Sequence, residues 1–270
     1  MKKKNSLINS IAAAPHVFWA VLFIVLPLLI VLYYAFTDAD GAFTLENIAS
    51  LSEYTPIFTL SVELSVIATF VCFIVGYPLA YIMARSSARA QKIYMMLLML
   101  PMWTNLLIRT YSIMAILDDG GFLNSILNTE FHIIGTKGAV IFGMVYDFLP
   151  YMVLPIYTCI SKIDKNMWEA ANDLGCSPIK VLTKVIFPLS ASGVISGITM
   201  VLVPSISTFY ISQKLGGGSF DLIGDTIERQ FQNQVTYHTG AAISLVMMIL
   251  ILVSLAIMNK FTDGEEEIIV

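Results

Sequence analysis

Six long apolar stretches, separated by short polar segments, dominate the hydrophobic pattern of this chain. They cover residues 17 to 36, 60 to 84, 93 to 117, 138 to 160, 186 to 211 and 240 to 259. A helix of about 20 apolar residues crosses the roughly 30 Å hydrocarbon core of a bilayer, where every backbone polar group needs a partner within the chain. The pattern therefore predicts an all-α integral membrane protein with six transmembrane helices.

The composition agrees with this prediction. Hydrophobic residues make up 57% of the chain and charged residues only 13%, whereas about 25% of the residues in soluble domains are charged. The lipid bilayer is therefore the expected environment of most of the surface, and no nucleic-acid partner is expected.

Positive charges set the expected orientation, because loops on the cytoplasmic side are enriched in Lys and Arg. With both termini in the cytoplasm, most of the 15 Lys and Arg residues fall on the cytoplasmic side. These are Lys2, Lys3, Lys4, Arg85, Arg89, Lys92, Lys162, Lys165, Lys180, Lys184 and Lys260. The others, Arg109, Lys137, Lys214 and Arg229, lie on or toward the outside. The N-terminal lysines followed by an apolar stretch that contains Pro27 favour a retained first helix over a cleaved signal.

A polar segment between the fourth and fifth stretches predicts a helix-turn-helix hairpin. Asp164 is placed to cap a first helix, and Gly175 supplies the left-handed residue that ends it. Ser177 and Pro178 then start a second helix, with Ser177 as N-cap and Pro178 at the first helical position. The orientation places this hairpin in the cytoplasm.

The hairpin carries the pattern Glu-Ala-Ala, three residues, Gly, nine residues and an apolar run that ends in Pro. This pattern resembles the coupling motif of ABC importer permeases, which docks into a cleft of the ATPase. The resemblance assigns ATPase coupling to Glu169, Ala170, Ala171, Asp173, Gly175 and Pro188. The family pattern ends in Ile, any residue, Leu and Pro, and here the run is Val185, Ile186, Phe187 and Pro188, which stays apolar. An ordinary amphipathic loop is the alternative interpretation.

Further segments resemble the permeases of spermidine/putrescine importers, and their PotB-like branch more than the PotC-like branch. They are residues 76 to 78, 100 to 111, 209 to 212, 215 to 217 and 222 to 225. The resemblance implies a type I ABC importer permease fold in a bacterial cell membrane. It divides the chain into a first span with its outer loop (1 to 57), a five-span permease core (58 to 259) and an acidic tail (260 to 270).

The same resemblance implies the partners of the chain. They are a second, PotC-like permease, two copies of an ATP-binding subunit and an extracytoplasmic polyamine-binding protein. The alternatives are a permease for another small solute and a self-contained secondary transporter. The second alternative is disfavoured, because the chain shows no doubling into similar halves, which many such transporters have.

The chain carries no visible chemistry of its own. Gly216, Gly217 and Gly218 follow Lys214 and are not followed by a Lys-Ser or Lys-Thr pair, so no Walker sequence is present. The three histidines and three cysteines lack metal-ligand spacing. We therefore expect a translocation subunit that is not an enzyme and holds no cofactor or metal, with ATP hydrolysed by a partner.

Four residues within or at the ends of the spans are candidates for the translocation pathway. Asp147 lies deepest, and a carboxylate beside aromatic rings is suited to guide a polycation, although pairing with Arg109 explains it equally well. Glu63 lies near the start of a helix, where the helix dipole favours an acid for structural reasons. Trp103 and Tyr210 either line the pathway or pack at the membrane interface.

The predicted topology can be tested by labelling. In a variant whose three native cysteines are replaced by alanine, a cysteine at Ser177 should react with an impermeant reagent only from the cytoplasm. A cysteine at Ser219 should react only from outside. Reversed labelling would contradict the orientation and the coupling interpretation together.

Overall fold

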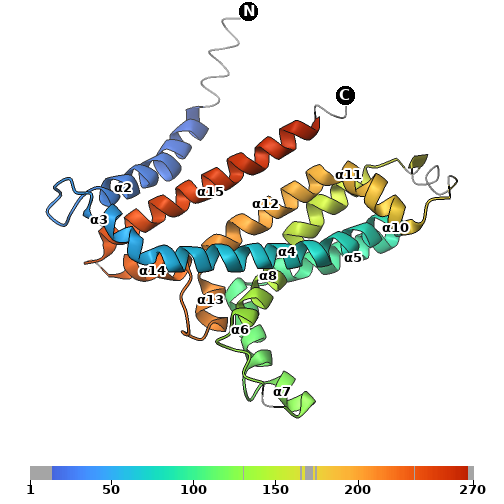
Figure 1. Cartoon of the computed structure of the whole chain (residues 1–270), viewed down its shortest axis with the longest axis horizontal. Helices are drawn as coiled ribbons and strands as arrows, with labels where there is room; N and C mark the ends of the chain where they lie inside the picture. The colour runs from blue at the N-terminus through green and yellow to red at the C-terminus, as the bar shows by residue number, and fades with distance from the viewer. Residues whose placement is uncertain are drawn as a thin grey trace, which may run out of the picture. The chain divides into compact units, whose positions relative to one another are not determined.

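The computed structural model describes residues 14–129, 131–164, 166–167, 173, 175–233 and 235–266, and these are helical apart from loops and one isolated bridge between Thr37 and Phe43 (Figure 1). The chain divides into two compact units. One comprises residues 1–55 and 226–250, and the other residues 56–225 and 251–270.

The first unit pairs an N-terminal helix with the first part of the C-terminal helix. Residues Ala14–Ala35 form a continuous helix that includes the π-helical turn η1 (Val21–Val25) and α2 (Leu26–Ala35). The short helices α3 (Glu46–Ala49) and η2 (Ser50–Tyr54) follow, and α15 (Tyr237–Glu266) returns beside α2 (Figure 1). Small Ala35, Ala241 and Ala242 are fully buried in the apolar cluster that joins the two helices.

The second unit contains the remaining helices. They are α4 (Thr55–Arg85), α5 (Ala88–Trp103), α6 (Leu106–Leu117), α7 (Phe122–Leu127), α8 (Lys137–Ser161), α10 (Pro178–Val181), η3 (Leu182–Ile186), α11 (Phe187–Leu189), α12 (Ala191–Ser207) and α13 (Tyr210–Leu215). Helix α14 (Ile223–Gln232) begins in this unit and ends in the first.

The predicted spans are present, but two of them are bent. In the described residues, four helices are long and apolar enough to cross a membrane, and the number is six if each of two bent helix pairs is one span. The third predicted span is Ala88–Trp103 followed by Leu106–Ile126 at 95°, and the fifth is Pro178–Leu189 followed by Ala191–Ser207 at 72°. Hydropathy located these two spans but not their bends, because it reports composition and not direction.

Local hydrogen bonds explain the sharper bend. Thr104 is extended, with ψ of 150°, and its hydroxyl donates to the carbonyl of Pro101 at 2.7 Å. Asn105 then caps the next helix, because its side-chain oxygen accepts from the backbone N–H of Leu107 at 2.8 Å. Side chains thus replace the helical hydrogen bonds that the break removes.

Helices α8 and α12 form the most closely packed pair of the second unit (Figure 1). A Cβ atom at Gly193 would lie 2.7 Å from Cβ of Cys159, and one at Gly197 would lie 3.0 Å from the carbonyl oxygen of Met152. Beside this contact, the hydroxyls of Tyr77 and Ser190 lie 2.9 Å apart and join α4 to the bend before α12. Glycine is therefore required at both positions for the helices to touch.

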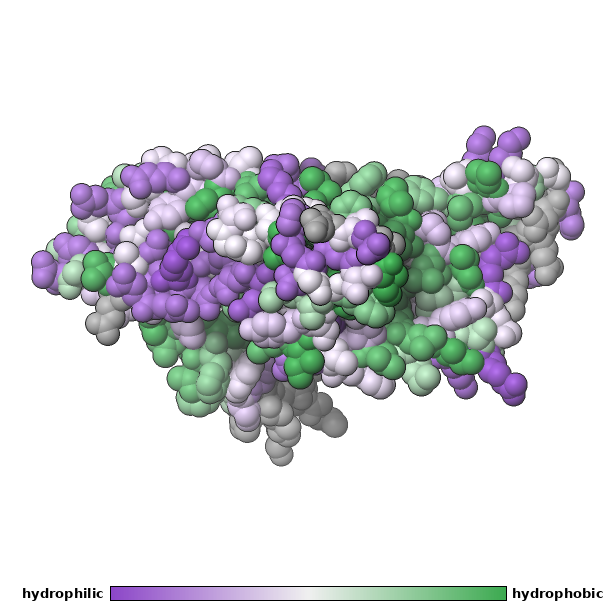
Figure 2. Space-filling view, turned by 90° about the horizontal axis from the view of Figure 1, so that it is seen from below, coloured by the Kyte–Doolittle hydropathy of each residue, from purple (hydrophilic) through white to green (hydrophobic). Residues whose placement is uncertain are grey.

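Many large apolar side chains point away from the protein interior. Figure 2 shows hydrophobic residues reaching the molecular surface in several places. Phe70 and Ile74 on α4 and Leu97 on α5 are each more than half exposed. Such surfaces are stable against lipid or another membrane subunit, as the sequence predicts.

We predict that Gly197→Val destabilises the folded chain by about 1 to 3 kcal/mol, because the added side chain overfills the contact between α8 and α12. Gly138→Val in the first turn of α8 is the matched control, since a Cβ there meets only the Thr136 hydroxyl, at 3.7 Å. Thermal unfolding in detergent measures both. Equal unfolding temperatures for the two variants would contradict the packing argument.

Candidate functional site

The predicted hairpin between α8 and α12 is described in part. Glu169, Ala170 and Ala171 lie outside the described residues, while Asp173 is exposed. Asp164 accepts a hydrogen bond from the backbone N–H of Asn166 at 3.0 Å, as an N-cap does. Gly175 has φ of +74°, which confirms the predicted left-handed turn.

The second half of the hairpin begins as predicted at Pro178. Ser177 is extended before it, but its side chain makes no capping hydrogen bond, so it holds the N-cap position through its backbone alone. The carbonyl of Ser177 accepts from the backbone N–H of Val181 at 3.0 Å. Helix continues through a π-helical turn to Leu189, with Pro188 directly before the 72° bend into α12. Ile179 in the first turn is 74% exposed.

A buried ion pair joins the third and fourth spans. Nε of Arg109 contacts Oδ1 of Asp147, and their side chains are 11% and 1% exposed. Nη1 of Arg109 also donates to the carbonyl of Pro101 at 2.6 Å, and its guanidinium lies 5.9 Å from the ring centroid of Tyr146. The structure thus shows Asp147 paired with Arg109, and a role of Asp147 in transport stays a prediction.

A pocket of about 320 Å³ lies beside this ion pair. Its walls come from α6, α8 and the break before α6, and they include Thr104, Ile108, Arg109, Ser112, Phe142 and Tyr146. The lining is mainly apolar and aromatic with few polar groups, and its volume is at the small end of the range for ligand pockets. Asp147 reaches this pocket only through Arg109, because its own side chain is buried.

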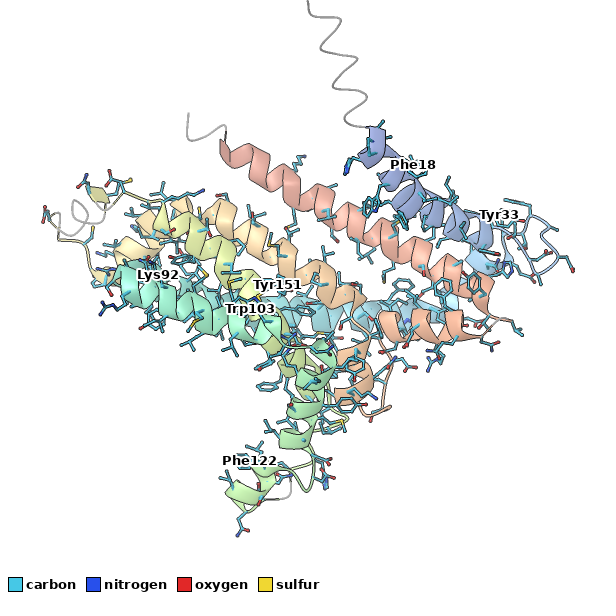
Figure 3. All side chains as sticks on the ribbon, turned by 180° about the vertical axis from the view of Figure 1, so that it is seen from behind. Phe18, Tyr33, Lys92, Trp103, Phe122 and Tyr151 are labelled. Carbon is cyan, nitrogen blue, oxygen red and sulfur yellow. The ribbon has the colours of Figure 1, made fainter. Side chains whose placement is uncertain are left out.

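The other predicted pathway residues lie elsewhere. Glu63 is half-exposed and lies 3.7 Å from Nζ of Lys137, at the surface. Trp103 is 75% exposed at the end of α5 (Figure 3). There it lines a separate groove with Lys92 and Tyr157. The structure thus distributes the candidates over several places, and their roles in transport stay predictions.

Tyr210 belongs to an aromatic group that the sequence did not reveal. Its ring centroid lies 6.2 Å from that of Tyr111, with the two planes at 77°. Nζ of Lys214 lies 5.2 Å from the ring centroid of Tyr111 and 5.7 Å from that of Tyr210. The spacing of Tyr210 and Lys214, one helical turn apart, was the available signal. Tyr111 comes from α6, and only the tertiary structure brings it there.

The comparisons with known proteins give one consistent family. Residues 76–264 match the family model described as binding-protein-dependent transport system inner membrane component. The spermidine/putrescine transport system permease protein PotB of Escherichia coli (strain K12) is 37% identical, covering 86% of this chain and 89% of that protein. PotB of Salmonella typhimurium is 36% identical over 92% of this chain and 91% of its own length. PotB of Haemophilus influenzae is 34% identical over 99% of this chain and 100% of its own length.

Solved structures show the same fold. A bacterial ABC transporter involved in the import of the acidic polysaccharide alginate has a TM-score of 0.76 at 15% identity, covering 97% of this chain and 96% of that chain. The inward-facing MetNI methionine ABC transporter has a TM-score of 0.58 at 15% identity, covering 78% of this chain and 94% of its own. The predicted ABC importer permease fold is thereby confirmed.

We predict that Asp147→Asn destabilises the chain by about 3 to 5 kcal/mol, because it leaves the buried guanidinium of Arg109 without its counter-charge. Glu63→Gln is the control, since the exposed pair of Glu63 with Lys137 contributes at most about 1 kcal/mol. The double variant Arg109→Met with Asp147→Leu should recover much of the loss. Thermal unfolding in detergent is the measurement, and wild-type stability of Asp147→Asn would show that the pair is not structural.

Proposed function

This chain belongs to the family of inner membrane components of binding-protein-dependent transport systems, and on that basis we propose that it is the permease subunit of an ABC importer for polyamines. The assignment of polyamines as the substrate rests on the identity of 34% to 37% with permeases named for spermidine and putrescine transport. These similarities extend over nearly the full length of the relatives. The chain would supply one half of the translocation pathway.

The energy for transport would come from separate subunits. The sequence holds no Walker motif, so two copies of an ATP-binding subunit would hydrolyse ATP. A second, PotC-like permease would complete the pathway, and an extracytoplasmic polyamine-binding protein would deliver the substrate. The chain itself would be a multi-pass protein of the bacterial inner membrane, with both termini in the cytoplasm and no enzymatic role.

The hairpin is the proposed contact with the ATPase. Gly175 turns the chain between its two halves, and exposed Ile179 offers an apolar contact in the second half. The hairpin joins α8 to α12, which touch through Gly193 and Gly197. The two helices touch so closely there that they cannot shift past each other easily. A displacement of the hairpin would therefore move α8 and α12 as one body. ATP-driven closure of the ATPase pair could in this way reach the pathway directly.

The proposed pathway offers an exposed acid and aromatic rings, which suit a polycationic substrate. The guanidinium of Arg109 neutralises the carboxylate of Asp147 in this structure, so Asp147 does not offer an unpaired negative charge to a cation. Exposed Glu63 and the aromatic rings of Trp103 and Tyr210 remain as pathway candidates that attract cations by charge and by their π-faces. These weak contacts suit a passage, since a conducting site must also release its cargo.

We predict that Gly175→Val abolishes ATP-driven polyamine uptake and releases the ATPase subunit during mild detergent purification. A branched side chain at positive φ is strained, which would misdirect the hairpin without altering the spans. Gly218→Val is a matched control: Gly175 and Gly218 both have φ of +74°, and a Cβ at either meets no atom within 4 Å. The two differ in the predicted side of the membrane.

Co-purification of the ATPase and uptake of labelled putrescine into proteoliposomes are the two measurements. Glu169→Lys should act like Gly175→Val, through charge reversal at the docking surface. Equal loss in Gly175→Val and Gly218→Val would indicate a general folding defect. Full ATPase binding and full uptake in both hairpin variants would remove the coupling role and favour a self-contained carrier.

A further inference from the structure

Two tyrosine rings from different helices form a corner that holds a lysine ammonium group. Tyr111 on α6 and Tyr210 on α13 meet edge to face, with centroids 6.2 Å apart and planes at 77°. Nζ of Lys214 lies within 6 Å of both centroids, at 5.2 Å and 5.7 Å. Two ring faces at such distances attract an ammonium group through their quadrupoles.

In the described part of the chain, the side chains of Tyr111 and Tyr210 are electrostatic partners of Lys214. The ion pairs found in the described part of the chain join Arg109 to Asp147, His132 to Asp119 and Lys137 to Glu63, and none of them includes Lys214. Tyr111 is 48% exposed, so the chain itself leaves part of the corner uncovered. The group therefore has the composition of an ammonium-binding site, and a side chain of the protein itself occupies it.

The surrounding packing allows Lys214 to leave without moving the rings far. Ile211 and Leu215, on the same helix as Lys214, are buried against α8 at Gly143, where a Cβ would lie 2.8 Å from the Ile211 side chain. This contact fixes the backbone of α13. The lysine side chain is long and flexible, so it can rotate out of the corner by changing its own torsion angles.

We propose that the corner formed by Tyr111 and Tyr210 binds a terminal ammonium group of the transported polyamine, and that Lys214 is a tethered competitor that occupies the corner when no substrate is present. The inference rests on the proposed function and adds Tyr111 and Lys214 to the pathway. A lysine side chain is a chain of four methylenes ending in a primary ammonium, which is also the structure of one end of a diaminobutane.

Competition follows from charge. Two ammonium groups in one corner would repel each other in a partly desolvated site, so the substrate must replace Lys214 and cannot join it. Replacement exchanges one ammonium for another and leaves the net charge of the corner unchanged. The substrate would therefore bind weakly and leave easily, as transport requires.

The test measures putrescine affinity in the membrane complex of this chain with its partner permease and ATPase, without the binding protein. Equilibrium dialysis of labelled putrescine gives the dissociation constant. Lys214→Met keeps an unbranched apolar stem and removes the competing charge, so affinity should rise about twofold to fivefold. Tyr111→Leu and Tyr210→Leu should each lower affinity by a similar factor, whereas Tyr111→Phe and Tyr210→Phe keep the ring face and should stay near wild type.

Coupling between the residues gives a second criterion. With Tyr111→Leu already present, Lys214→Met should bring little further gain, because the competitor has lost its site. Unchanged or weaker putrescine binding in Lys214→Met, with an assembled complex, would overturn the inference while leaving the proposed function intact. Failure of the wild-type complex to take up any polyamine with ATP and binding protein would overturn the proposed function, and the inference with it.

Discussion

The absence of water in the hydrocarbon core is the constraint from which the rest of this structure follows. A helix that breaks there must satisfy its freed backbone groups from side chains. At the break after Trp103, the carbonyl of Pro101 accepts hydrogen bonds from the Thr104 hydroxyl and from the guanidinium of Arg109. The charge thus introduced needs a counter-charge, which Asp147 supplies from α8. Arg109 thus links the bend of the third span to the acid of the fourth.

The same constraint shapes how motion would pass through the protein. Rigid contacts between spans need small residues, because lipid gives no hydrophobic drive for helices to associate. Gly193 and Gly197 provide such a contact between α8 and α12, and the hairpin joins the same two helices. A displacement imposed on the hairpin therefore acts on a packed pair and not on a single flexible span. The pocket beside Arg109 and the corner of Tyr111 and Tyr210 both adjoin this pair or the helices that pack on it.

The sequence predicted those features that depend on local chemistry. Apolar length predicted the spans, and the glycine at 175 and the acid at 164 predicted the turn and the cap that the structure shows. Hydropathy is blind to direction and did not locate the bends, although Pro101, Thr104 and Asn105 were visible breakers. The partner of Asp147 stayed open, since a paired acid and a substrate-binding acid look alike in a sequence. The contact of Lys214 with Tyr111 joins residues about a hundred positions apart, and no single-sequence signal reports such a pair.

The central claim is that this chain is the membrane-spanning part of an ATP-driven polyamine importer. Its most direct test is uptake of labelled putrescine and spermidine into proteoliposomes that contain the chain alone or together with its partner permease, ATPase and binding protein. The account predicts uptake only when all components and ATP are present, with excess unlabelled polyamine competing and neutral or anionic solutes without effect. Uptake by the chain alone without ATP, or ATP-driven uptake by the full complex of a non-cationic solute in place of polyamines, would contradict it.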